Sequence, residues 1–85
     1  MDVAEMNRLR WRCTRRALLE MDLLLGDFLE NHFDKLTPEQ EQAFVELADM
    51  EDLSLWPLIT GKQACATVRQ AEVVALLRAA RRQKQ

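Results

Sequence analysis

The chain has 85 residues, of which 48% are apolar and 31% are charged, so it has room for one small domain with a thin core. Two glycines, two prolines and no tyrosine fit poorly with a β-sheet, whose strands and turns use these residues heavily. The net charge of -2 argues against a nucleic-acid binder, and no apolar run approaches the roughly 20 residues that span a bilayer.

The N-terminal third is predicted to form two helices, over residues 3–13 and 15–31. The first has a mixed face that includes Met6, Leu9 and Trp11. The second is the most apolar segment of the chain, and its apolar arc is expected to face the core. That arc comprises Ala17, Leu18, Met21, Leu24, Leu25 and Phe28.

The third helix has the clearest start signal. Thr37 is placed to cap it, Pro38 suits its first position, and Gln40 completes a capping box. The helix is expected to run to about residue 49. Its predicted inward side chains are Phe44, Leu47 and Ala48.

The fourth predicted helix is short and contains a proline. It spans Leu53 to Thr60, with Asp52 as its natural cap and Gly61 at its end. Pro57 removes one backbone hydrogen bond in its second turn, so we expect a tight or distorted segment.

The fifth predicted helix covers residues 65–82, after a loop over residues 62–64. Its inward side is expected to hold Val68, Val73, Leu76, Leu77 and Ala80. Five short helices joined by short loops predict a compact all-α array. We expect a single domain over residues 1–85, with a frayed tail at about 82–85.

Charge is divided sharply along the chain. Residues 1–16 carry five arginines against two acidic residues, and residues 17–61 carry eleven acidic residues against one lysine. Residues 62–85 carry six basic residues against one glutamate. Two interpretations stay open: the basic ends neutralise the acidic middle within the fold, or they meet an acidic partner or a membrane surface.

Residues with catalytic or metal-binding potential are few. His32 is the only histidine, and its position at a predicted helix end indicates a capping or surface residue. Cys13 and Cys65 are too distant in the sequence to form a zinc site with it unaided, and two reduced, partly buried thiols in a cytoplasmic protein are favoured over a disulfide. No glycine-rich phosphate loop occurs, and Ser54 has no nearby base. We therefore expect neither enzyme activity nor a bound metal.

The outer face of the second predicted helix is polar. Arg16, Glu20, Asp27 and Asn31 fall within about 60° of one another there, and Leu19 and Leu23 flank them. One interpretation is an Arg16–Glu20 salt bridge within the helix, although this order of charges is the poorer one and contributes only about 0.2–0.5 kcal/mol. Arg15 and Arg16 would also lie at a helix N-terminus, where the helix dipole disfavours cations. The other interpretation is a charged patch that faces a partner.

Trp11 stands among the arginines of the first predicted helix. An exposed cluster of tryptophan and arginine is the composition of an interface hot spot, and core packing is the alternative.

Several separated features together resemble the SdhE/YgfY family of flavinylation factors, whose motif reads R-G-x-x-E, usually followed by a hydrophobic residue and Asp. The matching stretches are R-L-R-W at residues 8–11 and R-R-A-L-L-E-M-D-L at residues 15–23. The L-T-P-E helix start at residues 36–39, Phe44, and D-L-S-L-W-P-L-I-T-G at residues 52–61 also resemble the family's layout.

The resemblance implies a bacterial, cytoplasmic, chaperone-like FAD assembly factor. Members of this family promote covalent attachment of FAD to the flavoprotein subunit of succinate dehydrogenase and to related fumarate reductases. Arg16 matches the motif's arginine, Glu20 its glutamate, and Asp22 the acidic residue that follows. The histidine that receives FAD belongs to the partner, so His32 is not given that role. FAD likewise belongs to the client, and direct FAD binding by this chain is left open.

Ala17 departs from the motif, which has glycine there. If that glycine serves a positive φ or a close backbone approach, alanine costs roughly 1–2 kcal/mol. Alternatively the second helix begins before residue 17, where alanine is favourable. We expect the departure to affect efficiency or partner choice more than the fold.

The resemblance and the helical pattern together predict a docking surface that aligns FAD and its acceptor histidine in the client by orientation. Its expected residues are Arg8, Trp11, Arg15, Arg16, Ala17, Leu19, Glu20, Asp22 and Leu23. Two other functions stay open. One is an antitoxin-like or regulatory protein that acts on a membrane-associated or cytoskeletal partner, and the other is a nucleic-acid binder that uses the basic ends.

Overall fold

The computed structural model describes residues 2–14 and 18–83 of the chain. Within them it contains five α-helices, one 3-10 helix and no strand, so the predicted all-α fold is confirmed. The 3-10 helix was not predicted. The elements are α1 (Val3–Thr14), α2 (Leu19–Asn31), η1 (Phe33–Lys35), α3 (Pro38–Ala48), α4 (Asp52–Thr60) and α5 (Val68–Gln83).

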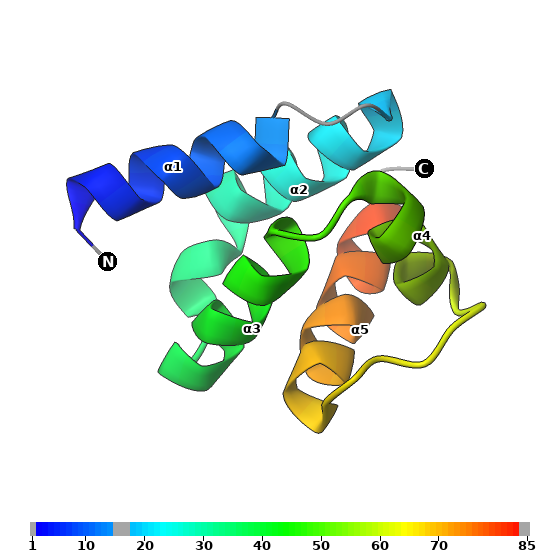
Figure 1. The fold of residues 1–85 in the computed structure, drawn as a ribbon. Coiled ribbons are helices and arrows are strands. Elements are labelled where there is room, and N and C mark those ends of the chain that lie inside the picture. Colours follow the sequence, from blue (N-terminus) through cyan, green and yellow to red (C-terminus); the bar gives the residue numbers. More distant parts are fainter. Residues whose placement is uncertain (1, 15–17, 84–85) are drawn as a thin grey trace.

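The helices enclose one core. Figure 1 shows α1 lying along α2, α3 and α5 side by side, and α4 against the C-terminal end of α5. Contacts between α2 and α5 close the array, so the first and last thirds of the chain meet. The C-terminal end of α5 consequently lies near the start of α2 (Figure 1).

Local capping sets three of the helix starts. Asp2 accepts a hydrogen bond from the Glu5 backbone N–H at 2.8 Å at the start of α1. The predicted capping box of α3 is confirmed, because Thr37 and Gln40 each accept a backbone N–H from the other. Thr67 accepts the Gln70 N–H at 3.1 Å, and α5 therefore begins at Val68 rather than at residue 65.

The start of α2 differs from the prediction. Leu18 has extended backbone angles (φ -93, ψ 121) and precedes the helix, which begins at Leu19 rather than at residue 15. The alternative that this helix begins before residue 17 is therefore wrong. The Leu18 N–H donates to the Asp52 carboxylate at 2.8 Å. Asp52 is thus not the cap of α4; Glu51 occupies that position without a side-chain capping bond.

The C-terminal end of α4 is stabilised by a glycine and by hydrogen bonds from α5. Gly61 adopts φ 84, a left-handed conformation that favours glycine, and ends α4 as predicted. Arg78 of α5 donates to the carbonyl oxygens of Ile59 at 2.7 Å and Leu58 at 2.8 Å. The helix runs unbroken across Pro57, whose carbonyl accepts the Lys62 N–H at 2.9 Å.

Aromatic rings from three elements form the centre of the core. Phe28 of α2 and Phe44 of α3 stack with ring centroids 5.3 Å apart, and Phe33 of η1 meets Phe44 edge-on at 5.5 Å. The predicted inward residues of α3 are all buried. In α5 the stripe of Val73, Val74, Leu77 and Ala80 is buried as well.

Three residues predicted to face inward are exposed. Val68 is the first residue of α5 and lies outside its buried stripe, and Leu76 borders that stripe on the solvent side. Leu18 is exposed because it precedes α2 and does not share the helix's apolar arc.

The cysteines and the histidine agree with the sequence analysis. Cys13 is buried, Cys65 is half-buried, and neither forms a disulfide. His32 is the C-cap of α2, where its backbone N–H donates to the Phe28 carbonyl.

Candidate docking site

The matching stretch at residues 15–23 begins between α1 and α2, and its first part, residues 15–18, is called the motif segment here. Arg15, Arg16 and Ala17 fall outside the described residues, so the effect of alanine at position 17 and the proposed Arg16–Glu20 bridge stay predictions. The structure describes where the segment ends. The bond from Asp52 to the Leu18 N–H fixes that end against α4.

The outer face of α2 carries exposed leucines, as the sequence indicated. Leu19 has 71% of its surface exposed and Leu23 has 64%. Single exposed leucines are common on protein surfaces, but two on adjacent turns beside charged residues form a patch that a partner can cover. Asp22, on the same helix, is half-buried.

Glu20 is paired with the far end of the chain. Arg81 of α5 donates to the Glu20 carboxylate through Nε and approaches it through Nη2, both at 2.9 Å. The Arg81 guanidinium also lies over the Trp56 ring of α4, 5.1 Å from its centroid. Glu20 and Arg81 are both partly exposed, so their bond contributes little stability. Its effect is to orient the motif's carboxylate.

Two further ion pairs join the basic N-terminal end to the acidic middle. Arg10 of α1 lies 3.4 Å from Glu30 of α2, and Arg12 pairs with Asp49 after α3. Together with Arg81–Glu20, these pairs support the interpretation that the basic ends neutralise the middle within the fold.

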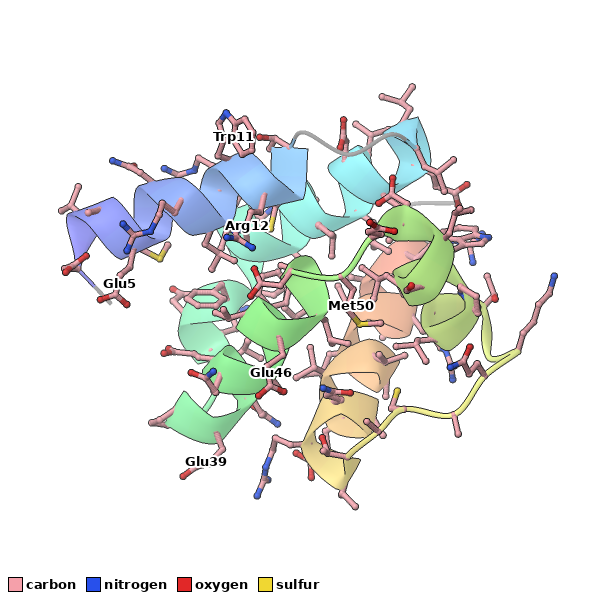
Figure 2. All side chains as sticks on the ribbon, in the orientation of Figure 1. Glu5, Trp11, Arg12, Glu39, Glu46 and Met50 are labelled. Carbon is pink, nitrogen blue, oxygen red and sulfur yellow. The ribbon has the colours of Figure 1, made fainter. Side chains whose placement is uncertain are left out.

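The outer side of α1 presents Trp11, which is 60% exposed and points away from the helices beneath it (Figure 2). The alternative of core packing for Trp11 is therefore wrong. Arg8 is exposed on the same helix and lines a shallow hollow with Arg12 and Asp49. Trp11 and Arg8 thus lie on α1, whereas Leu19 and Leu23 lie on α2.

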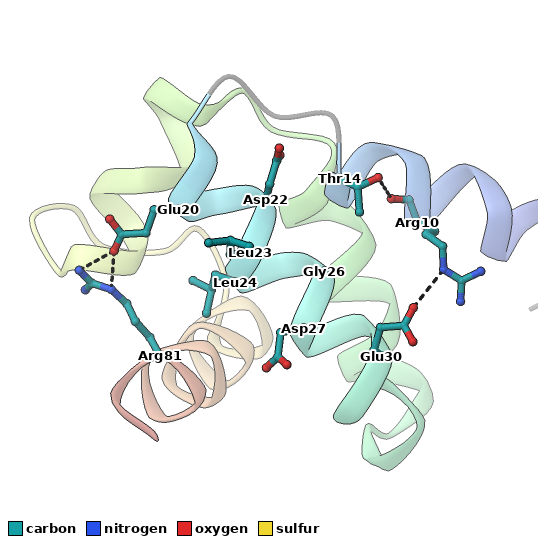
Figure 3. A pocket seen from close by; sticks show the side chains of 10 residues that line it. All are labelled: Arg10, Thr14, Glu20, Asp22, Leu23, Leu24, Gly26, Asp27, Glu30 and Arg81. Carbon is teal, nitrogen blue, oxygen red and sulfur yellow. Dashed lines mark hydrogen bonds and ion pairs between the residues drawn. The ribbon is translucent and has the colours of Figure 1, made fainter. Parts of the chain in front are cut away.

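A groove of about 690 Å³ runs along the outer face of α2. Figure 3 shows Leu23 and Leu24 near its centre, the Glu20–Arg81 pair at one end and the Arg10–Glu30 pair at the other. α2 forms the floor, and the C-terminal ends of α1 and α5 form the walls. The lining residues are Arg10, Thr14, Glu20, Asp22, Leu23, Leu24, Gly26, Asp27, Glu30 and Arg81.

The groove contains three of the predicted docking residues, namely Glu20, Asp22 and Leu23. The sequence did not indicate Arg81 and Asp52 as partners of the motif region, or Arg10 as the partner of Glu30. The basic ends were a signal for ion pairs with the middle, but the sequence does not identify which cation meets which carboxylate.

The described residues contain no group of histidine, cysteine and carboxylate side chains that could hold a metal ion. Over residues 2–14 and 18–83, no helix combines the length and apolar character that crossing a bilayer requires. The arrangement offers an apolar strip between charged rims, which suits protein binding.

Comparison with known proteins identifies the family. A family model described as flavinator of succinate dehydrogenase matches residues 7–81. The chain is 44% identical over 63 residues to the FAD assembly factor SdhE of Legionella pneumophila (strain Paris), across 74% of this chain and 78% of that protein. It is 32% identical over 78 residues to the FAD assembly factor SdhE of Shewanella oneidensis, across 92% of this chain and 94% of that protein. The resemblance inferred from the motifs is confirmed.

Proposed function

This chain belongs to the family of flavinators of succinate dehydrogenase, and we propose on that premise that it binds the flavoprotein subunit of the enzyme and promotes covalent attachment of FAD. The observation that carries the proposal is the family match over residues 7–81. That range includes the motif segment, α2 and every residue that lines the groove.

The docking surface is formed by the motif segment and its surroundings. Arg16 belongs to it by its match to the motif, with Arg15 before it and Ala17 at the position of the motif's glycine. Leu19, Glu20, Asp22 and Leu23 continue it along α2. Arg8 and Trp11 extend it onto α1. The exposure of Leu19, Leu23 and Trp11 supports this assignment, because a partner that covers them removes apolar surface from water.

The chain acts by orientation rather than by chemistry. Docking holds the client in an arrangement that aligns bound FAD with its acceptor histidine, and orientation alone can supply up to about 7–11 kcal/mol of a reaction barrier. No side chain of this protein touches the reacting atoms. The position of His32 supports a structural role for this histidine. Its backbone N–H caps the end of α2, and its ring centroid lies 5.3 Å from that of Phe28.

FAD remains with the client throughout. The groove on α2 bears four carboxylates and two arginines, and each arginine is already paired with a glutamate. We assign the protein to the bacterial cytoplasm and extend its clients to the flavoprotein of fumarate reductase.

Charge reversal tests the proposal. Arg16→Glu and Glu20→Lys are each expected to abolish binding to the flavoprotein subunit and its in-gel flavin fluorescence, with far-UV circular dichroism unchanged. Glu39→Lys on the exposed start of α3 is the matched control and is expected to leave flavinylation intact. Full flavinylation with both motif variants would refute the assignment.

A charge swap distinguishes two roles of Glu20, namely its ion pair with Arg81 and its proposed contact with the partner. The double variant Glu20→Arg/Arg81→Glu restores the ion pair between α2 and α5 while moving the carboxylate to the other helix. Flavinylation is expected to stay lost in the swap, because the partner must meet the carboxylate on α2. Rescue by the swap would assign Glu20 a purely structural role.

A further inference from the structure

We propose that Arg81 of α5 and Trp56 of α4 are positioning residues for the motif's Glu20. They hold one oxygen of the Glu20 carboxylate, so that the other oxygen is presented to an N–H donor of the flavoprotein subunit. This inference rests on the proposed function, because the donor belongs to the client that the function names. It identifies the atom through which Glu20 meets that client.

The Arg81 guanidinium contacts a single oxygen of the Glu20 carboxylate. Its Nε donates to Oε1 at 2.9 Å, and its Nη2 lies 2.9 Å from the same oxygen. Figure 3 shows both contacts meeting at one oxygen, while the other oxygen points away from Arg81. Among residues 2–14 and 18–83, no side chain or backbone group donates to Oε2. A carboxylate accepts hydrogen bonds at both oxygens, so Oε2 retains the capacity to accept one from a partner.

Trp56 supports the other side of the arginine. The Arg81 guanidinium lies over the Trp56 ring, 5.1 Å from its centroid, in a cation–π contact. Trp56 is half-buried and packs against the hydrophobic core, so its ring is a fixed platform. Arg78, one turn earlier on α5, donates to two carbonyls near the end of α4 and holds the two helices together. The position of the Arg81 side chain is therefore set by α4 as well as by its own helix.

The contribution of this arrangement is to binding more than to folding. The Arg81 side chain is 35% exposed and that of Glu20 is 54% exposed, and ion pairs at such sites add little stability. A glutamate without a fixed neighbour samples several rotamers, and binding a partner must then restrict it to one. Glu20 has lost much of this freedom before the partner arrives, so less conformational entropy is lost on binding.

Glu20→Gln tests whether Oε2 must be an acceptor. The amide keeps one oxygen and replaces the other with an NH2 group, which is a donor. Whichever way the amide is turned, its NH2 group faces either Arg81 or the partner's N–H. Calorimetric titration with the flavoprotein subunit is expected to show about 10-fold weaker binding. Glu72→Gln, in the exposed Arg69–Glu72 pair of α5, is the matched control and should change binding less than about 2-fold.

Variants of Arg81 and Trp56 test the two positioning residues. Arg81→Gln is expected to weaken binding about 10-fold, whereas Arg81→Lys keeps the charge without the planar fork and should weaken it about 3-fold. Trp56→Leu is expected to weaken binding about 3-fold, and Trp56→Phe, which keeps an aromatic face, less than about 2-fold. Arg69→Gln is the matched control, because Arg69 is an exposed arginine of the same helix that pairs with a glutamate at 3.1 Å.

Two further measurements distinguish positioning from a direct contact or a structural role. In a Glu20→Ala background, Arg81→Gln is expected to change binding less than about 2-fold, because Arg81 acts through Glu20. In NMR spectra of the free full chain, the Arg81 Nε–H signal should exchange slowly with water. That protection is expected to disappear in Glu20→Ala and to remain in Trp56→Phe.

The outcomes separate failure of this inference from failure of the proposed function. Wild-type affinity in any of Arg81→Gln, Trp56→Leu or Glu20→Gln would overturn the inference, even if Glu20→Lys abolishes binding. An equal loss from Arg81→Gln with and without the Glu20 carboxylate would overturn it as well, since Arg81 would then contact the partner itself. Failure of the proposed function appears instead as unchanged flavin fluorescence in Arg16→Glu and Glu20→Lys.

Discussion

The bond between Asp52 and Leu18 makes a sharp prediction, because it joins α4 to the end of the motif segment. The Asp52 carboxylate accepts the Leu18 N–H at 2.8 Å and lies in the first turn of α4. A hydrogen bond to a charged group contributes about 1.5–3 kcal/mol, and the lower end applies at this partly exposed site. The favourable interaction of Asp52 with the N-terminus of α4 adds about 0.3–1 kcal/mol.

Asp52→Ala is therefore expected to lower the free energy of unfolding by about 2 kcal/mol. For a domain of this size that corresponds to a fall in Tm of roughly 8–16 °C. Asp52→Asn keeps an acceptor oxygen and should lose only about 1 kcal/mol. Urea denaturation followed by far-UV circular dichroism measures both changes.

The function should respond as well, since this bond holds Leu18, which directly follows Ala17, against α4. Flavin fluorescence of the client is expected to fall with Asp52→Ala even at temperatures where the variant is fully folded. Glu51→Gln is the matched control, because the neighbouring Glu51 side chain makes no capping bond. A loss of stability for Asp52→Ala no larger than that of Glu51→Gln would refute the reasoning.

Two other substitutions test the fold around the site. Arg78→Met removes two hydrogen bonds to carbonyls near the end of α4 and is expected to lower the free energy of unfolding by about 2–3 kcal/mol in urea denaturation. Arg78→Lys should lower it by about half as much. Equal losses for the two variants would contradict the role of the paired bonds. Gly26→Ala is expected to raise the free energy of unfolding by about 0.5–1 kcal/mol, because the residue is inside α2 and a Cβ there meets the Thr14 methyl at an ordinary 3.6 Å. A lower thermal midpoint for Gly26→Ala would show that the helices cannot accommodate the methyl group.

Features that depend on neighbours in the sequence were predicted well. The capping box of Thr37 and Gln40 and the left-handed Gly61 are local, so the sequence contains all that determines them. The same local signal at Thr67, with Gln70 three residues later, marks the true start of α5 and was overlooked. The exposure of Leu19 and Leu23 followed from the helical period alone.

Features that depend on tertiary contacts were not predictable. Asp52 is a good capping residue by type, but its carboxylate bonds to a backbone N–H that lies 34 positions away. The period of α5 placed Leu76 inward, yet Leu76 is 41% exposed and lines a hollow with His32 and Lys35, which the periodicity of α5 alone does not reveal. Helical spacing offered Arg16 as the partner of Glu20, and the structure pairs Glu20 with Arg81 of α5 instead of a residue close to it in the sequence.

The arrangement of the groove also bears on how the chain is made. The motif and α2 belong to the first part of the chain to be synthesised, but one wall of the groove comes from Arg81, which is 61 positions beyond Glu20. A product that terminates before α5 contains the full motif and lacks the cation that orients its glutamate. It also leaves the core face of α2 uncovered where α5 should pack. Chains that end before α5 therefore present the motif on an unfinished surface.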